Sequence, residues 1–231
     1  MSLGTRLDWI GTESCIQFRF MVRCAKSLVS IGESAVQDNR NPRVKVIGSE
    51  VLGESWGRLT RWTLDLQRRN GDWQRQQRET YDRGDGAAIL LCNKEKKTVV
   101  LTRQFRFPVY FNGEPGYLIE VCAGKLDGDD PVTCARKEAE EETGYRVTDV
   151  RQVFGPCYMS PGSVTERLSL FVAHYDAASK VSEGGGHAHE GEDIEVLELP
   201  FDRAMEMVGT GEISDAKTLI LLQYAALNSL I

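Results

Sequence analysis

Apolar and polar residues alternate at every second position over residues 61–66, which is typical of a half-buried β-strand. A shorter run of the same kind begins at Val44. An Asn-Gly pair follows at residues 70–71, and this dipeptide is the strongest short-range signal for a hairpin. A return strand is therefore expected over residues 73–80, and the pattern predicts a small antiparallel sheet over residues 43–82.

After residue 85 the alternation gives way to short runs that are apolar at almost every position, as strands buried on both faces are. Strands are expected over residues 87–92, 98–102, 117–122, 151–154, 168–174 and 194–199. Helical periodicity predicts helices over residues 131–143, 201–208 and 215–227. A proline-containing loop is expected at 107–116, and a mobile, Gly-rich loop at 177–192. Strands and helices interleave without regular βαβ spacing, which favours an α+β fold with a mixed sheet.

Residues 1–42 mix short apolar and polar pieces and end at a cluster of breaking residues, Asn39-Arg40-Asn41-Pro42. We interpret them as a peripheral extension with room for one short helix, and we assign them no chemistry. The chain is therefore divided into this extension (1–42), the small sheet (43–82) and a main domain (83–231).

Composition and charge exclude several classes of protein. Hydrophobic residues make up 41% of the 231 residues and charged residues 27%, which argues against a largely disordered chain. The formal net charge is −6 and no Lys/Arg cluster stands out, so nucleic-acid binding is not expected. No run approaches the ~18 uncharged apolar residues that a membrane span needs, so no membrane association is expected.

The cysteines and the N-terminal charges indicate a compartment. Six cysteines are spread along the chain without a C-x-x-C pair, which is typical of reduced thiols in a cytoplasmic protein. Arg19, Arg23 and Lys26 interrupt the apolar residues near the N-terminus, so no signal peptide is expected. We therefore expect a cytoplasmic protein.

The predicted helix at 131–143 carries more negative charge at its end than stability alone favours. Glu138, Glu141 and Glu142 share one face, because residues three or four apart are neighbours on a helix. Like charges at these spacings cost a few tenths of a kcal/mol each, and carboxylates near a helix C-terminus oppose the macrodipole by ~0.3–1 kcal/mol. A divalent cation over this face would compensate, and Mg²⁺ prefers carboxylate oxygens. The alternative is an ordinary solvated acidic face.

The residues around this helix resemble the Nudix box, G-x5-E-x7-R-E-U-x-E-E-x-G-U, in which U is apolar. Gly124 precedes the helix, and Lys137-Glu138-Ala139-Glu140-Glu141-Glu142-Thr143-Gly144-Tyr145 covers its end. The chain departs from the pattern in three ways. The spacer after Gly124 is one residue short, Asp129 stands in place of the first glutamate, and Lys137 stands in place of the arginine. The three helix glutamates are kept, so the resemblance predicts metal binding beside an altered loop.

The resemblance extends from about Trp56 to the C-terminus, and within the Nudix hydrolases it is to the nucleotide-sugar pyrophosphatases, close to those that act on ADP-ribose. It is carried by Tyr81-Asp82-Arg83-Gly84, Arg103-Gln104-Phe105-Arg106, Tyr158-Met159-Ser160-Pro161-Gly162 and Glu192-Asp193-Ile194-Glu195-Val196. It implies the Nudix fold, an α/β/α sandwich with a mixed sheet, for residues 83–231. It also implies a homodimer in which the small sheet of residues 43–82 takes part.

The activity that the resemblance implies is Mg²⁺-dependent hydrolysis of the pyrophosphate bond in a nucleoside diphosphate sugar, with Mn²⁺ as an alternative cation. The expected substrate is GDP-mannose, which would give GMP and mannose 1-phosphate. Two alternatives stay open: ADP-ribose as the substrate, or a catalytically silent Nudix-like nucleotide sensor. The retained box glutamates favour an enzyme over a sensor.

Site residues are carried over by the same resemblance. Metal ligands are expected at the backbone carbonyl of Ala123 and at Glu138, Glu142 and Glu192. Glu192 is alternatively the general base, with Glu190 in reserve, and Glu141 either ligates the metal or assists catalysis. Substrate contacts are expected at Trp56, Arg78, Glu79, Arg106, Ala123, Gly124, Glu166 and Lys217.

Four of these residues have specific roles in the resemblance. Trp56 would stack on the base, and Arg106 would form bidentate contacts to phosphate. Arg78 and Glu79 lie on the predicted return strand and would reach the site of the partner subunit in a dimer.

Overall fold

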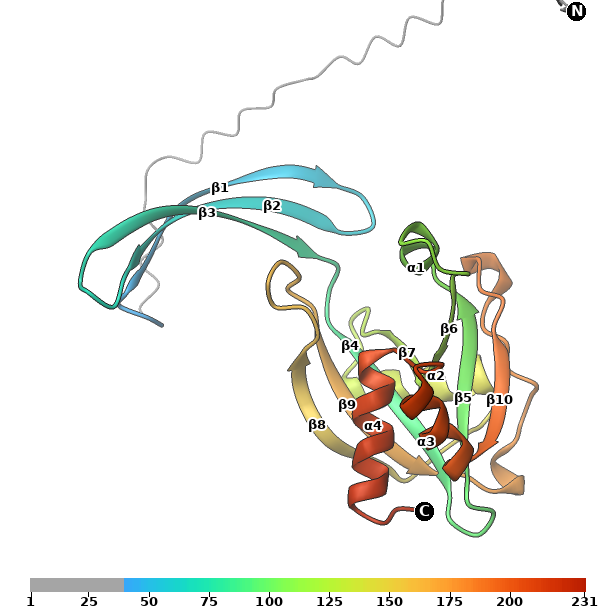
Figure 1. Cartoon of the computed structure of the whole chain (residues 1–231). Coiled ribbons are helices and arrows are strands. Elements are labelled where there is room, and N and C mark those ends of the chain that lie inside the picture. The colour runs from blue at the N-terminus through green and yellow to red at the C-terminus, as the bar shows by residue number, and fades with distance from the viewer. Residues whose placement is uncertain (1–39) are drawn as a thin grey trace, which may run out of the picture. The chain divides into compact units, whose positions relative to one another are not determined.

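The computed structural model of the chain describes residues 40–231 (Figure 1). The extension and the short helix expected in it lie almost entirely outside these residues. Cys92, Cys122, Cys134 and Cys157 are the cysteines within this range, and all four are free thiols. No helix in the described part of the chain is both long enough and apolar enough to cross a bilayer.

The alternating segment forms a three-stranded antiparallel sheet, as its pattern predicts. Its strands lie in chain order: β1 (Val44–Glu54), β2 (Arg58–Gln67) and β3 (Trp73–Asp82). β2 and β3 pair without interruption along their whole length. Within residues 44–82, Thr60 is the only buried residue, so this sheet has no hydrophobic core of its own.

Seven strands between residues 86 and 200 form a second, mixed sheet. Its path runs through β10 (Glu195–Pro200), β5 (Thr98–Phe105), β4 (Gly86–Asn93), β9 (Arg167–His174) and β8 (Val150–Tyr158), with β6 (Tyr117–Glu120) beside β5 and β7 (Cys122–Lys125) beside β4. β4 and β9 run parallel, and the other pairs are antiparallel. The mixed sheet confirms the expected α+β class.

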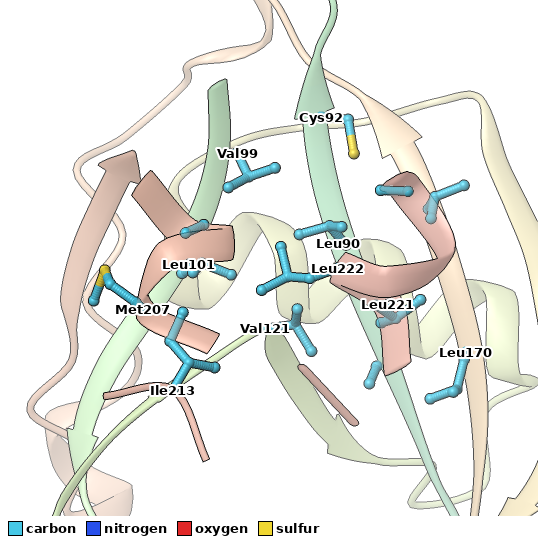
Figure 2. Packing of buried hydrophobic residues seen from close by; sticks show 14 of the residues in the cluster. Leu90, Cys92, Val99, Leu101, Val121, Leu170, Met207, Ile213, Leu221 and Leu222 are labelled. Atoms are coloured by element: carbon cyan, nitrogen blue, oxygen red, sulfur yellow. The ribbon is translucent and has the colours of Figure 1, made fainter. Parts of the chain in front are cut away.

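Helices cover both faces of the mixed sheet (Figure 1). α2 (Pro131–Thr143) packs on one face, and α3 (Phe201–Thr210) and α4 (Ala216–Leu227) pack on the other. Leu90 of β4 packs with Leu222 of α4 in the cluster shown in Figure 2. The next residue back along β4, Ile89, faces the opposite way and packs in the cluster that contains Ala135 of α2. Burial on both faces explains why the strand is apolar at every position, and it confirms the α/β/α sandwich.

Local sequence signals fix both ends of α2. The carboxylate of Asp130 accepts hydrogen bonds from the backbone N–H groups of Val132 and Thr133, which have no partner inside the helix. Pro131 stands at the start of the first turn, where a missing N–H costs nothing. Gly144 ends the helix in the left-handed conformation, with φ +75°. The predicted helix at 131–143 is confirmed to the residue.

The structure corrects two predictions between residues 107 and 122. The expected loop at 107–116 contains a short helix, α1 (Phe107–Phe111), because its proline lies in the first turn rather than in the interior. The expected single strand at 117–122 is two strands, β6 and β7, separated by Val121. β6 pairs with β5 and β7 pairs with β4, and an apolar run in the sequence does not reveal a change of partner.

Candidate active site

The C-terminal half of α2 lies against β7, and two glutamates of the helix meet the backbone of the strand. The Glu138 carboxylate lies so close to Gly124 that a Cβ atom at this position would be 1.7 Å from Oε1. Glu142 Oε2 accepts a hydrogen bond from the backbone N–H of Ala123, at 3.3 Å. Only glycine fits at position 124 without moving Glu138. The two glutamates and the two backbone positions predicted from the box are therefore brought together.

Glu142 lies in an environment that disfavours its negative charge. The residue is buried. Its pKa is raised to about 8, chiefly by burial and then by the negative charge of Glu138, whereas the positive charge of Arg106 opposes the shift. A divalent cation near this carboxyl would favour the ionised form and would offset the repulsion between the two glutamates.

The loop of residues 177–192 packs on the end of α2. Gly185 and Gly186 donate backbone hydrogen bonds to the carbonyl oxygens of Glu142 (2.9 Å) and Glu141 (3.1 Å). These bonds satisfy two of the carbonyls that a helix leaves without partners at its C-terminus. Gly184 has φ +71°, and a Cβ atom there would be 2.5 Å from the carbonyl oxygen of Glu142. The glycines thus allow close packing against the acidic helix, and the mobility of the loop stays a prediction.

His187, in the same loop, contacts both residues that were predicted to be catalytic. Its backbone N–H donates a hydrogen bond to Glu192 Oε2 at 2.8 Å. Its ring Nε2 lies 3.5 Å from Glu141 Oε2. The loop therefore holds Glu192 on the same side of the molecule as the end of α2.

A cavity of about 600 Å³ opens beside these residues. Seven of the predicted site residues line it: Trp56, Arg106, Ala123, Gly124, Glu138, Glu142 and Glu192. Its size suits a ligand larger than a free phosphate. A second cavity, of about 500 Å³, lies beside β8 and β9 and is lined by none of the predicted residues.

Five predicted site residues do not line the cavity. Glu141 lies beside it, against His187. Glu166 forms an ion pair at 3.4 Å with Arg83, which does line the cavity. Lys217 is buried behind it, where its ammonium group contacts two carboxylates.

The remaining two, Arg78 and Glu79, lie on β3 within the three-stranded sheet. Arg78 donates a hydrogen bond to the carbonyl oxygen of Gln77, and Glu79 forms an ion pair at 2.9 Å with Arg61. Neither side chain contributes to the cavity of its own chain. Their predicted role in the site of a partner subunit stays a prediction.

Two of the residues that depart from the Nudix pattern contact each other. Lys137 Nζ forms an ion pair with Asp129 Oδ2, across the start of α2. The shorter acid and the lysine therefore replace the glutamate and arginine of the pattern as a pair. This pair ties Asp129, at the end of the shortened spacer, to the helix.

Sequence reasoning missed several residues of the cavity wall. Arg83, Gln104, Phe105 and Tyr117 all line it. Arg83, Gln104 and Phe105 belong to motifs that carry the family resemblance, so the sequence offered a signal for these three residues. Glu120 does not line the cavity but is buried and contacts Arg106. A single carboxylate in an otherwise apolar strand was the signal for Glu120.

The donor set suits a hard divalent cation. Carboxylate oxygens of Glu138, Glu142 and Glu192 and the backbone of Ala123 line one cavity, and oxygen is the donor that Mg²⁺ and Mn²⁺ prefer. Within residues 40–231, no three His, Cys, Asp or Glu side chains stand close enough together to form a complete metal centre as they lie. Bound metal would therefore also use backbone oxygen, water or substrate oxygens, as Mg²⁺ commonly does.

The α/β/α fold and the acidic helix beside the cavity are the features expected of a Nudix hydrolase, and sequence comparison agrees. The sequence model of the NUDIX domain matches residues 82–221, more than half of the chain, and the chain belongs to the Nudix family. A second model, described as the GDP-mannose pyrophosphatase NudK N-terminal domain, matches residues 43–81, the three-stranded sheet. The family predicted from the box is therefore confirmed.

Curated relatives are similar over nearly their whole length. A protein of Cronobacter sakazakii named GDP-mannose pyrophosphatase is 54% identical over 188 residues, which cover 81% of this chain and 97% of the relative. Proteins of the same name from Citrobacter koseri and Escherichia coli O157:H7 are 53% and 52% identical over 190 residues, covering 82% of this chain and 98% of each relative.

Proposed function

We propose that this chain is a hydrolase that cleaves the pyrophosphate bond of GDP-mannose, giving GMP and mannose 1-phosphate. The observation that carries the proposal is the meeting of Glu138 and Glu142 with the backbone of Ala123 and Gly124, in a cavity that also holds Arg106. The names of relatives that share more than half of their residues with this chain supply the substrate.

The cation we assign is Mg²⁺, with Mn²⁺ as a substitute. Nudix pyrophosphatases generally use divalent metal ions. Glu138, Glu142, Glu192 and the carbonyl oxygen of Ala123 would hold the ion. Bound there, it supplies charge neutralisation for the pyrophosphate and a more acidic water.

The side chains of the cavity divide the remaining work by their chemistry. The guanidinium of Arg106 binds and orients phosphate oxygens, because its planar donors match them. Trp56 offers an exposed ring for the base to stack on. Glu192, or Glu141 beside it, accepts the proton of the attacking water, whose oxygen forms the new bond to phosphorus as the anhydride bond breaks.

We also propose that the chain acts as a homodimer through its three-stranded sheet. Ile47, Val51, Leu52 and Trp73 in this sheet are exposed large apolar residues. A small sheet without its own core is marginal alone, and apolar surface of this kind favours a protein contact. We propose accordingly that residues 43–82 are a dimerisation unit, between the extension (1–42) and the Nudix domain (83–231). The spread-out thiols support a cytoplasmic location.

The test is turnover of a panel of nucleotide sugars by the purified full-length chain. With Mg²⁺ present, we expect GDP-mannose to be consumed and GMP and mannose 1-phosphate to appear by chromatography, and EDTA to stop the reaction. Faster turnover of ADP-ribose would contradict the substrate assignment. Tight nucleotide binding without turnover of any compound would contradict the enzyme assignment and favour the nucleotide sensor. A monomeric mass in light scattering would contradict the homodimer.

A further inference from the structure

Behind the wall of the cavity, one buried carboxylate connects two cationic side chains. Glu120 is the last residue of β6, and its side chain is 4% exposed. Its Oε2 accepts a hydrogen bond from Arg106 Nε at 2.7 Å, and its Oε1 accepts one from Lys217 Nζ at 2.6 Å. Neither the box nor the residues carried over by resemblance include Glu120.

The group is balanced in charge and anchored to the fold. Lys217 also contacts Asp215 Oδ1 at 3.0 Å, so two cations face two carboxylates. Asp215 caps α4 through the backbone N–H of Thr218, and the Thr218 hydroxyl oxygen accepts a hydrogen bond from the backbone N–H of Val121. The four charged groups are therefore fixed between the start of α4 and the junction of β6 with β7.

We propose that Glu120 is a positioning residue, which holds the guanidinium of Arg106 in the orientation that receives the phosphates of the substrate. This inference rests on the proposed function. It gives Lys217 a different role from the substrate contact implied by resemblance. Lys217 neutralises Glu120 from behind, so that Glu120 can orient Arg106 without repelling an anionic ligand.

The geometry of Arg106 supports this role. Glu120 accepts a hydrogen bond from Nε of Arg106. Among the described residues, no hydrogen bond or ion pair involves Nη1 or Nη2 of Arg106. Arg106 lines the cavity, and its side chain is 38% exposed, so these donors stay available to a ligand. A long arginine side chain loses rotamer freedom when it binds, and fixing it beforehand removes that cost from binding.

The experiment is a double-mutant cycle of E120Q and R106A, read in KM and kcat for GDP-mannose. E120Q keeps the volume of the side chain and removes its charge. We expect E120Q alone to raise KM by roughly 10- to 100-fold, the size of a lost charge-assisted contact, with a much smaller change in kcat. In the R106A background, we expect E120Q to add almost nothing to KM. An E120Q effect of full size in that background would overturn the proposal.

A matched control comes from β10, an edge strand of the same sheet. Glu198 on β10 also accepts a hydrogen bond from a lysine, Lys96, and it contacts the hydroxyl of Tyr175. E198Q should leave KM unchanged. If E120Q does not fold, E120D takes its place in the cycle. It keeps the negative charge but withdraws the carboxylate from both Arg106 and Lys217 by one methylene group. An unchanged KM for a folded E120D would overturn the proposal.

The same cycle is read a second time in the Kd of GDP, by calorimetry without turnover. This separates the inference from the function on which it rests. A wild-type chain that binds GDP but does not hydrolyse GDP-mannose would refute the proposed function, and the cycle in Kd would still decide the role of Glu120. Independent effects of the two substitutions on Kd would refute the positioning role even if turnover is observed.

Discussion

The two sheets of this chain differ in the charged residues that are buried in and beside them. In the three-stranded sheet, charges lie on exposed strand faces as opposite pairs, such as Asp65 with Arg75 and Glu54 with Arg58. In the mixed sheet, every residue of β4 is buried and its side chains are almost all apolar. Within the described part of the chain, the buried acidic residues are Glu120 of β6 and Glu142 of α2, which packs on this sheet, and both lie at the cavity or just behind its wall.

This difference separates stability from function. Exposed ion pairs are solvated whether or not they form, so they contribute little to folding. The apolar faces of the mixed sheet contribute most of the stability by burial. A buried carboxyl with a raised pKa, such as that of Glu142, opposes folding, and its presence indicates that it serves the site.

The largest effect should come from removing the charge of Glu142. We expect Glu142→Gln to lower kcat by about 10³-fold or more, because the variant loses a metal-binding oxygen at the reacting centre. The metal-free variant should unfold at the same or a higher temperature than the wild type, because glutamine does not ionise at a buried site. Steady-state kinetics and thermal unfolding measure the two quantities. Unchanged kcat would contradict the assignment of the site.

The pH dependence of the free energy of unfolding should differ between the wild type and Glu142→Gln. The folded pKa of Glu142, about 8, lies above its ordinary value of 4.5, so the folded state binds this proton more tightly than the unfolded state. The free energy of unfolding of the metal-free wild type should therefore fall as pH rises from about 4.5 to 8, by at most ~5 kcal/mol. Glu142→Gln should lack this contribution. Denaturant unfolding of both proteins, with EDTA, measures the difference, and parallel pH profiles would contradict it.

The two sheets can be compared directly by the same substitution in each. Leu90→Ala removes a fully buried side chain of β4, and we expect it to cost about 2–5 kcal/mol of unfolding free energy. Leu64→Ala in the partly exposed β2 should cost clearly less, because the site is open to solvent and leaves no closed cavity. Chemical denaturation of the two variants tests the comparison. Equal losses would mean that the small sheet is buried in the assembled protein.

The smallest effect should come from the turn between β2 and β3. Gly71 has φ +94°, and Gly71→Ala should cost about 1 kcal/mol through backbone strain alone, since no atom would contact the new methyl group. kcat and KM should be unchanged, because the turn lies at the opposite end of β2 and β3 from Trp56 and none of its residues lines the cavity. Thermal unfolding measures the cost, and a loss as large as that of Leu90→Ala would contradict it.

Local signals made parts of the fold predictable from the sequence. The bounds of α2 followed from Asp130, Pro131 and Gly144, each of which acts within one turn of the helix. The turn between β2 and β3, at residues 68–72, was signalled by the Asn70-Gly71 pair within it. The acidic face of α2 and its match to the Nudix box identified the part of the site that lies on one helix.

Contacts between distant residues could not be predicted in this way. Lys217 and Glu120 are 97 positions apart, and no periodicity relates them. Resemblance gave Lys217 only as a substrate contact, which stays a prediction, and its contacts with two carboxylates had no signal in the sequence. The change of strand partner at Val121 was hidden for the same reason, because the apolar pattern reports burial and not which strand lies alongside.

Val121 also sets a distance within the site. The residue before it, Glu120, holds Arg106, and two residues after it, Ala123 contacts Glu142. Successive residues of a strand face opposite sides, so inserting or deleting one residue here would turn either Glu120 away from Arg106 or the backbone N–H of Ala123 away from Glu142. Val121 is therefore a spacer of one residue, and its length keeps Arg106 in line with Glu142 of α2.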